Sequence, residues 1–146
     1  MQLKLRKRLW QKGRKSKALI FGVTAIIYAI IIFYLSSQSQ PPEIVEPFVF
    51  NFDKLAHLLE FGLFGALLFM TFAYADWRPW DAPLAMTLGI IYGVVDEFHQ
   101  FFVPGRVADL LDALVNAIGV VIVVAILAYF DRKWYQPPLS EESYKV

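Results

Sequence analysis

The sequence of 146 residues contains no cysteine, and no acidic residue precedes Glu43. The first absence excludes disulfides, iron–sulfur clusters and thiolate metal sites, so a metal ion would need the two histidines or the carboxylates. The second absence coincides with an excess of positive charge, because eight of the fourteen lysines and arginines lie within the first 17 residues. The charge is therefore distributed unevenly along the chain, although the formal net charge is only +1.

Hydrophobic side chains dominate the composition, at 58% of the residues, and aromatic residues account for 16% of the chain. A soluble domain of this length carries far fewer apolar residues, so we expect a protein that lies in a lipid bilayer. The length leaves room for one domain, and the sequence contains neither an internal repeat nor a low-complexity region. The lipid bilayer is therefore the first partner that the composition predicts.

The basic segment over 1–17 is followed at once by a charge-free stretch from Ala18 to Leu35, which is long enough to cross a bilayer. The positive-inside rule then places the amino terminus in the cytoplasm. A nucleic-acid-binding arm and a cleaved signal peptide are the alternative interpretations. The apolar run that follows favours a membrane anchor over the first alternative, so we expect no nucleic acid as a partner. The signal peptide is disfavoured because the apolar run is longer than a usual signal-peptide core and lacks an Ala-x-Ala-like cleavage site before Ser36.

Three further apolar segments follow, and each is bounded by residues that begin or end a helix. Asp53 is a candidate N-cap for the second segment and Asp81 for the third, while Pro104-Gly105 predicts a tight turn before the fourth. We therefore expect an all-α polytopic membrane protein, a four-helix transmembrane bundle with both termini in the cytoplasm. The predicted spans are about 18–35, 55–75, 82–101 and 107–130, preceded by a basic cytoplasmic segment over 1–17 and followed by a polar cytoplasmic tail over 131–146.

Polar and ionisable residues interrupt the apolar segments near the ends that this topology places outside the cytoplasm. Such residues are costly inside a membrane and are more often retained for function than by accident. They lie at the start of the second segment, the end of the third and the start of the fourth, so we expect them to meet at one membrane face. The candidate pocket residues are Asp53, Lys54, His57, Glu60, Asp96, Glu97, Gln100, Arg106, Asp109, Asp112 and Asn116.

Helical spacing predicts which of these side chains share a face. Asp53, His57 and Glu60 stand at positions i, i+4 and i+7 of the second apolar segment. Asp109, Asp112 and Asn116 stand at i, i+3 and i+7 of the fourth. A histidine on such a face is able to act as a general acid or base near neutral pH. The two sets are expected to line one polar pocket.

Carboxylates from neighbouring helices are typical ligands of hard divalent cations. We therefore treat Asp96, Asp109 and Asp112 as candidate ligands for Mg²⁺ or Mn²⁺. In such a site Lys54 and Arg106 would bind the phosphate of a substrate. This set of residues predicts a metal-dependent enzyme only as one of several hypotheses.

Most of these residues also have a structural interpretation. Asp53 is able to serve only as a helix cap, Lys54 to extend its ammonium group to the interface, and Arg106 to pair with Asp109 and hold the turn. Asn116 is able to link two helices by a hydrogen bond within the membrane. The surplus of carboxylates over one arginine nevertheless favours a functional site.

Five short motifs follow one another along the chain. They are Tyr34-Leu35-Ser36-Ser37-Gln38, Asp53-Lys54-x-x-His57, Asp96-Glu97-x-x-Gln100, Pro104-Gly105-Arg106 and Asp109-x-x-Asp112-x-x-x-Asn116-x-x-Gly119. Their joint order resembles the VanZ-like family of small bacterial membrane proteins, over about Tyr28 to Ala125. The resemblance implies a multi-pass protein of the bacterial plasma (inner) membrane and cell envelope, in a family whose named member is associated with resistance to the glycopeptide teicoplanin. Where the family pattern has an aromatic residue in the second span, this chain has Glu60.

Three hypotheses from different functional classes follow. The first is an envelope protein whose outer acidic pocket binds a lipid-linked wall precursor, a glycopeptide or a partner protein without catalysis. The second is a membrane enzyme that uses a divalent cation to act on a lipid-linked phosphate. The third is a cation- or proton-coupled carrier, which with four helices would require a homo-oligomer.

Overall fold

The computed structural model describes residues 2–39 and 47–134, and in these ranges the protein consists of helices and turns without a strand. The predicted all-helical membrane bundle is confirmed. The loop residues Glu43 and Glu46 and most of the predicted tail lie outside the described residues. The helices are α1 (Gln2–Ser36), α2 (Pro47–Ala75), α3 (Asp81–Gln100) and α4 (Leu110–Trp134).

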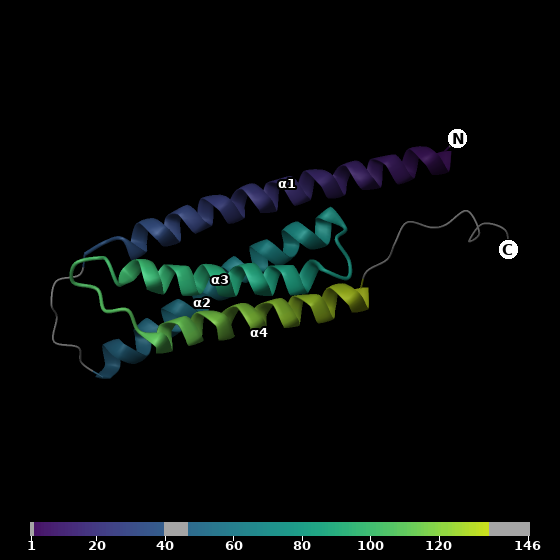
Figure 1. The fold of residues 1–146 in the computed structure, drawn as a ribbon. Coiled ribbons are helices and arrows are strands. Elements are labelled where there is room, and N and C mark those ends of the chain that lie inside the picture. Colours follow the sequence, from purple (N-terminus) through teal and green to yellow (C-terminus); the bar gives the residue numbers. More distant parts are fainter. Residues whose placement is uncertain (1, 40–46, 135–146) are drawn as a thin grey trace.

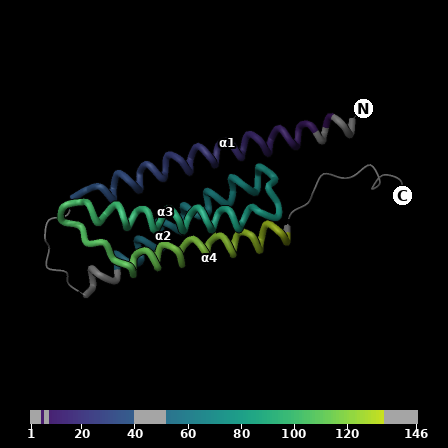
Figure 2. Tube along the Cα trace, viewed as in Figure 1, coloured from purple at the N-terminus to yellow at the C-terminus, as the bar shows by residue number. Residues whose placement is uncertain are grey.

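The four helices lie side by side and alternate in direction, so that α1 and α3 finish where α2 and α4 begin (Figure 1). We call this the acidic end, and it also carries the loop between α3 and α4. The other end, here called the basic end, holds the basic start of α1, the finish of α4 and the connector from α2 to α3 (Figure 2). The two ends therefore collect different parts of the sequence.

Three helical segments are long and apolar enough to cross a bilayer: Arg8–Ser36, Phe52–Ala75 and Leu110–Lys133. The shorter α3 is less apolar, because Asp81, Asp96 and Glu97 lie within its 20 residues. It nevertheless packs against both α2 and α4 along the bundle. The count of four membrane spans stays a prediction, whereas the four-helix arrangement is observed.

Two helix starts differ from the sequence-based expectation. The helix α2 begins at Pro47, so Asp53 lies inside the helix and the prediction that it is the N-cap is wrong. Proline is well suited to the first position of a helix, where its missing N–H group would be unpaired in any case. At α4 the helix begins at Leu110 rather than at about Val107, and Asp109 precedes it.

The start of α3 agrees more closely with the prediction. Asp81 is its first residue and accepts a hydrogen bond at Oδ1 from the backbone N–H of Ala82, at 2.8 Å. The residue in the N-cap position is Trp80, which makes no capping hydrogen bond through its side chain. Asp81 therefore supports the helix start from one position further along than predicted.

Small residues allow the helices to approach closely in the middle of the bundle. A Cβ atom at Gly119 of α4 would collide with the backbone carbonyl oxygen of Leu58 in α2, and one at Gly89 of α3 would lie 2.8 Å from Val120 Cγ1. Gly62 and Gly119 meet in the same way across α2 and α4. These glycines are close-packing positions, as expected for helices that associate in lipid.

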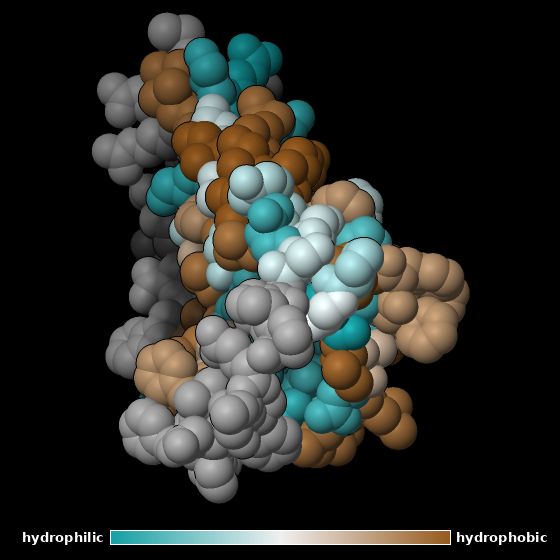
Figure 3. All heavy atoms as spheres, turned by 90° about the vertical axis from the view of Figure 1, so that its left-hand side faces the viewer, coloured by the Kyte–Doolittle hydropathy of each residue, from teal (hydrophilic) through white to brown (hydrophobic). Residues whose placement is uncertain are grey.

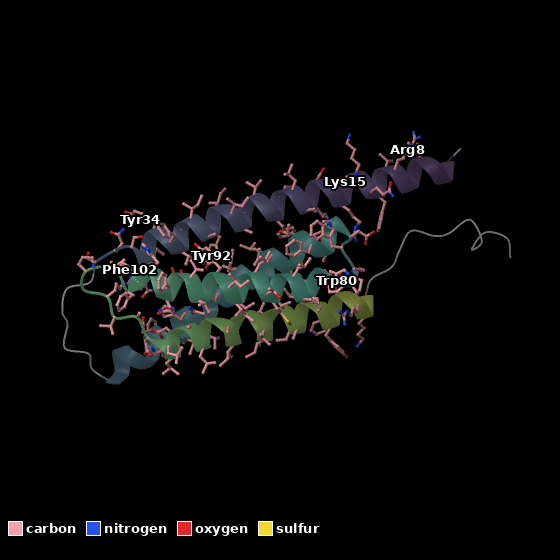
Figure 4. The ribbon with its side chains drawn as sticks, in the orientation of Figure 1. Arg8, Lys15, Tyr34, Trp80, Tyr92 and Phe102 are labelled. Carbon is pink, nitrogen blue, oxygen red and sulfur yellow. The ribbon has the colours of Figure 1, made fainter. Side chains whose placement is uncertain are left out.

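Helix α1 is the least enclosed of the four, and it packs mainly against α2. Ala25 and Ile32 face the bundle and are buried, whereas the apolar side chains on the other face are exposed, as suits contact with lipid. A link to α3 comes from Tyr92, whose hydroxyl donates to the carbonyl oxygen of Ala29 at 2.6 Å (Figure 4). The face of α1 that points away from the bundle is thus available to the bilayer.

The basic end joins its helices through paired charges. Arg14 of α1 pairs with Asp76 at 3.5 Å, and Arg78 pairs with Asp131 at the finish of α4. Trp77 and Trp80 of the connector are largely exposed, and Trp80 can be seen at this end in Figure 4. Exposed tryptophans beside basic residues are typical of a membrane interface.

Candidate binding cavity at the acidic end

A cavity of about 190 Å³ lies between α1, α2 and α3 at the acidic end. Figure 3 looks onto this end, where hydrophilic side chains gather toward the middle and hydrophobic ones lie around them. The cavity has apolar lining mainly from α1 and polar lining mainly from α2, α3 and the loop after α3. The lining residues are Ile32, Leu35, Ser36, Asp53, Ala56, His57, Glu60, Asp96, Gln100 and Arg106.

Helix α2 contributes one polar face to the cavity. Asp53, His57 and Glu60 all line it, which agrees with their spacing of four and three residues. The Nε2 atom of His57 lies 3.9 Å from Asp53 Oδ1, while the side chain of Asp53 is 52% exposed. The cavity therefore reaches the surface of the protein beside Asp53.

Helix α3 contributes Asp96 and Gln100, which are both buried. The amide Nε2 of Gln100 donates to Asp96 Oδ2 at 3.0 Å. The second carboxylate oxygen, Asp96 Oδ1, has no hydrogen-bond partner among the described residues, although Asp96 is only 4% exposed. A buried acceptor without a donor is costly, and in a cavity wall it is a candidate for ligand contact.

Arg106 closes the cavity from the loop between α3 and α4. Its guanidinium donates to the carbonyl oxygens of Gln38 at 3.2 Å and of Leu35 at 3.0 Å. These are groups at the finish of α1, where the helix dipole favours a positive charge. Among the described residues no ion pair joins Arg106 to Asp109, so the structure gives the arginine a different role from the proposed turn contact.

A second polar cluster lies between α2 and α4. Lys54 Nζ donates to Asp109 Oδ2 at 2.9 Å and also to Asp112 Oδ1. Asp109 is the N-cap of α4, because its Oδ1 accepts the backbone N–H of Leu111 at 2.9 Å. That backbone hydrogen bond, together with the Lys54 ammonium, lowers the pKa of the Asp109 carboxyl below its ordinary value of 3.8.

Glu97 and Asn116 extend this cluster into the bundle. Glu97 Oε2 accepts the backbone N–H of Asp109 at 3.3 Å, and Glu97 Oε1 has no partner among the described residues. Asn116 is fully buried, and its Oδ1 lies 3.2 Å from His57 Nδ1. His57 therefore stands between the two polar regions, with Nδ1 toward α4 and Nε2 toward Asp53.

The three predicted metal ligands are not brought together. Asp109 and Asp112 share Lys54, whereas Asp96 lies in the wall of the cavity between α1, α2 and α3. Among the described residues, a different set comes within metal-binding reach of one another: Asp53, His57 and Asp112 offer ligand atoms within 4.8 Å. These are an exposed carboxylate, an imidazole and a buried carboxylate, a donor set that suits a transition-metal ion better than Mg²⁺.

Sequence reasoning missed two serines at the finish of α1. Ser36 lines the cavity, and its buried Oγ has no partner among the described residues. Ser37 Oγ lies 2.9 Å from His99 Nε2, and the His99 ring lies against the Phe33 ring with centroids 4.4 Å apart and the planes tilted by 31°. Both serines are part of the motif that begins at Tyr34, but a serine at the end of an apolar helix does not by itself indicate a binding role.

The geometry is that of a membrane bundle with one polar cavity, and comparison with known proteins assigns it to a family. No curated protein and no solved structure matches the chain. A family model described as VanZ/LLP1 matches residues 8–131, which is most of the chain and includes every residue of the cavity wall. The protein is a membrane protein that belongs to the VanZ/LLP1 family.

Proposed function

We propose that this protein acts in the bacterial plasma membrane by binding a glycopeptide or a lipid-linked wall precursor in the acidic cavity, without making or breaking a bond. The observation that carries the proposal is Asp96, which lines the cavity and whose buried Oδ1 has no donor among the described residues. Glycopeptides and wall precursors are rich in amide, hydroxyl and amine donors. The resemblance to a family with a member linked to teicoplanin resistance supports this ligand class.

The binding test uses the full chain in lipid nanodiscs with teicoplanin and, separately, a lipid-linked wall precursor. Calorimetry should show saturable binding of one of them to the wild type. The Asp96→Asn variant, which keeps the shape but removes the charge, should bind about tenfold more weakly or worse. The matched control is Asp76→Asn at the basic end, which should bind like the wild type; equal binding by both variants would contradict the proposal.

A second candidate is a metal-dependent enzyme, and the group formed by Asp53, His57 and Asp112 favours it. Lys54 opposes it, because its ammonium group already pairs with Asp112. Titration of the purified protein with Mg²⁺, Mn²⁺ and Zn²⁺ tests the idea. Saturable binding that disappears in Asp112→Asn would favour the enzyme, whereas no binding of any of these ions would remove this metal site from consideration.

The proposal also requires that the acidic end faces away from the cytoplasm. The natural absence of cysteine makes single-cysteine labelling clean. Cysteines introduced at Ser39 or Val107, both exposed at the acidic end, should react in intact cells with a thiol reagent that does not cross membranes. A cysteine at Lys15 should react only after the cells are opened, and the reverse pattern would place the cavity in the cytoplasm.

A further inference from the structure

The polar wall of the cavity contains more carboxylates than positively charged arginines. Asp53, Glu60 and Asp96 place three carboxylates in it, against one arginine. The guanidinium of Arg106 already donates to two carbonyl oxygens at the finish of α1. The surplus of negative charge disfavours a ligand that presents a carboxylate or a phosphate to this wall and favours one that presents a cation.

Two buried atoms in the wall have no hydrogen-bond partner among the described residues. They are Asp96 Oδ1 and Ser36 Oγ, and both residues are at least nine-tenths buried. A carboxylate oxygen only accepts hydrogen bonds, and a hydroxyl accepts as well as donates. The missing counterpart of Asp96 Oδ1 is therefore a donor, supplied by what enters the cavity.

The cavity suits a group of several atoms better than a bare metal ion. Its volume of about 190 Å³ is several times the roughly 30 Å³ that one water molecule takes up in the liquid. Among the described residues, Glu60 and Asp96 belong to no group of three ligands within metal-binding reach. The acceptors are thus spread around a space rather than gathered on one point.

We propose that the cavity recognises a primary ammonium group, with the carboxylates of Asp96 and Glu60 and the hydroxyl of Ser36 as its acceptors. The inference rests on the proposed function and specifies which part of the ligand enters the cavity. A primary ammonium has three N–H donors, which matches three acceptors from three helices or helix ends. Its hydrogen bonds to carboxylates are charge-assisted and hence stronger than neutral ones.

The direct test compares two small probes of similar size on the detergent-purified full chain. Ethanolamine carries an ammonium group at pH 7, and ethylene glycol carries a hydroxyl in its place. Calorimetry should show saturable binding of ethanolamine and none of ethylene glycol at the same concentrations. Asp96→Asn and Glu60→Gln should each weaken ethanolamine binding by about tenfold or more, Ser36→Ala by less, and Asp76→Asn not at all.

An aminolipid headgroup and a soluble amine offer the same chemistry, so a second arm separates them. Nanodiscs that contain equal amounts of phosphatidylethanolamine and phosphatidylcholine are analysed by native mass spectrometry after release of the protein. Selective retention of phosphatidylethanolamine by the wild type and not by Asp96→Asn identifies a headgroup as the source. Ethanolamine binding without such retention identifies a soluble amine.

Equal affinity for the two small probes, or unchanged ethanolamine binding in both carboxylate variants, would overturn the inference. If Asp96→Asn does not fold, ethanolamine binding by Glu60→Gln decides the test. This variant should fold, because the Glu60 side chain makes no hydrogen bond among the described residues. The outcome is also separable from the proposed function. Teicoplanin or precursor binding that depends on Asp96, without ethanolamine binding, would keep the proposed function and reject the ammonium group.

Discussion

The two ends of this bundle both carry charged residues, yet they use them differently. At the basic end, Arg14 pairs with Asp76 and Arg78 with Asp131, and the acids of both pairs are partly exposed. At the acidic end, Asp96 and Glu97 are buried, and each has one carboxylate oxygen without a partner among the described residues. The carboxylates of the two ends therefore differ in whether a buried oxygen is left without a partner in the described part of the chain.

This difference separates charge that holds the fold from charge that exceeds what the fold requires. Partly exposed ion pairs next to Trp77 and Trp80 fix helix ends at a membrane interface, and each contributes little energy. Buried unpaired carboxylate oxygens are costly and persist where a ligand or a reaction uses them. The acidic end is not uniform, however, because Lys54 satisfies Asp112 there. The following predictions probe the distinction from the largest effect to the smallest.

The largest effect is expected from Lys54→Met. Lys54 is the cation that pairs with Asp112, and their side chains are 15% and 9% exposed. Removal of the cation leaves a buried carboxylate without its counter-charge, which should cost about 3 kcal/mol of unfolding free energy. Thermal unfolding in detergent measures the loss, with Lys15→Met on the exposed face of α1 as the control. Equal unfolding midpoints for both variants would show that the Lys54 pair is not part of the fold.

Gly119→Ala should have the next largest effect. The added Cβ would collide with the Leu58 carbonyl oxygen, so α2 and α4 would have to separate at a cost of about 2 kcal/mol. Gly13→Ala is the matched control, since a Cβ there meets nothing within 4 Å. The control should unfold at the same temperature as the wild type or slightly higher. An unchanged midpoint for Gly119→Ala would mean that the two helices are less closely packed than described.

Asp131→Asn at the basic end should cost less than about 1 kcal/mol, because the side chains of Arg78 and Asp131 are partly exposed. The same unfolding experiment measures it, and raising the salt concentration should shrink the difference from the wild type further. A loss as large as that of Lys54→Met would remove the distinction between the two ends.

The smallest effect concerns acidification. The folded state lowers the pKa of Asp109, so the stabilisation from its ionised form is fully present above its unfolded value and is lost as the pH falls through the lower folded value. The unfolding midpoint of the wild type should therefore decline more steeply below about pH 4 than that of Asp109→Asn. Parallel curves for the two proteins would show that Asp109 contributes nothing to the pH dependence.

The sequence predicted the helical membrane bundle well, because few other folds accommodate long apolar segments and charge concentrated at one end of the chain. It predicted the face formed by Asp53, His57 and Glu60, since helical periodicity fixes which side chains align. It misplaced the start of α2, where Pro47 begins the helix rather than ending the loop. Periodicity describes one helix at a time, whereas contacts between helices depend on how each is rotated against its neighbour.

Because periodicity does not fix how the helices are rotated, the sequence grouped three metal ligands that the structure does not bring together. The sequence placed Asp96, Asp109 and Asp112 in one cluster, and all three do lie at the acidic end. Lys54 binds Asp109 and Asp112, however, whereas Asp96 lines the cavity between α1, α2 and α3. It also left Ser36 out of the site, because a serine near a helix end gains its meaning only from the cavity beside it. The partners of Arg106, two carbonyl oxygens of α1, are likewise invisible in a sequence.

The most direct measurement is the unfolding midpoint of ligand-free Asp96→Asn beside that of the wild type. If the carboxylate serves a ligand, its replacement by the isosteric amide removes a buried unpaired charge while Gln100 keeps an acceptor, so the midpoint should stay equal or rise. A fall comparable to that of Lys54→Met would mean that Asp96 stabilises the fold, and the acidic end would then not differ in kind from the basic end.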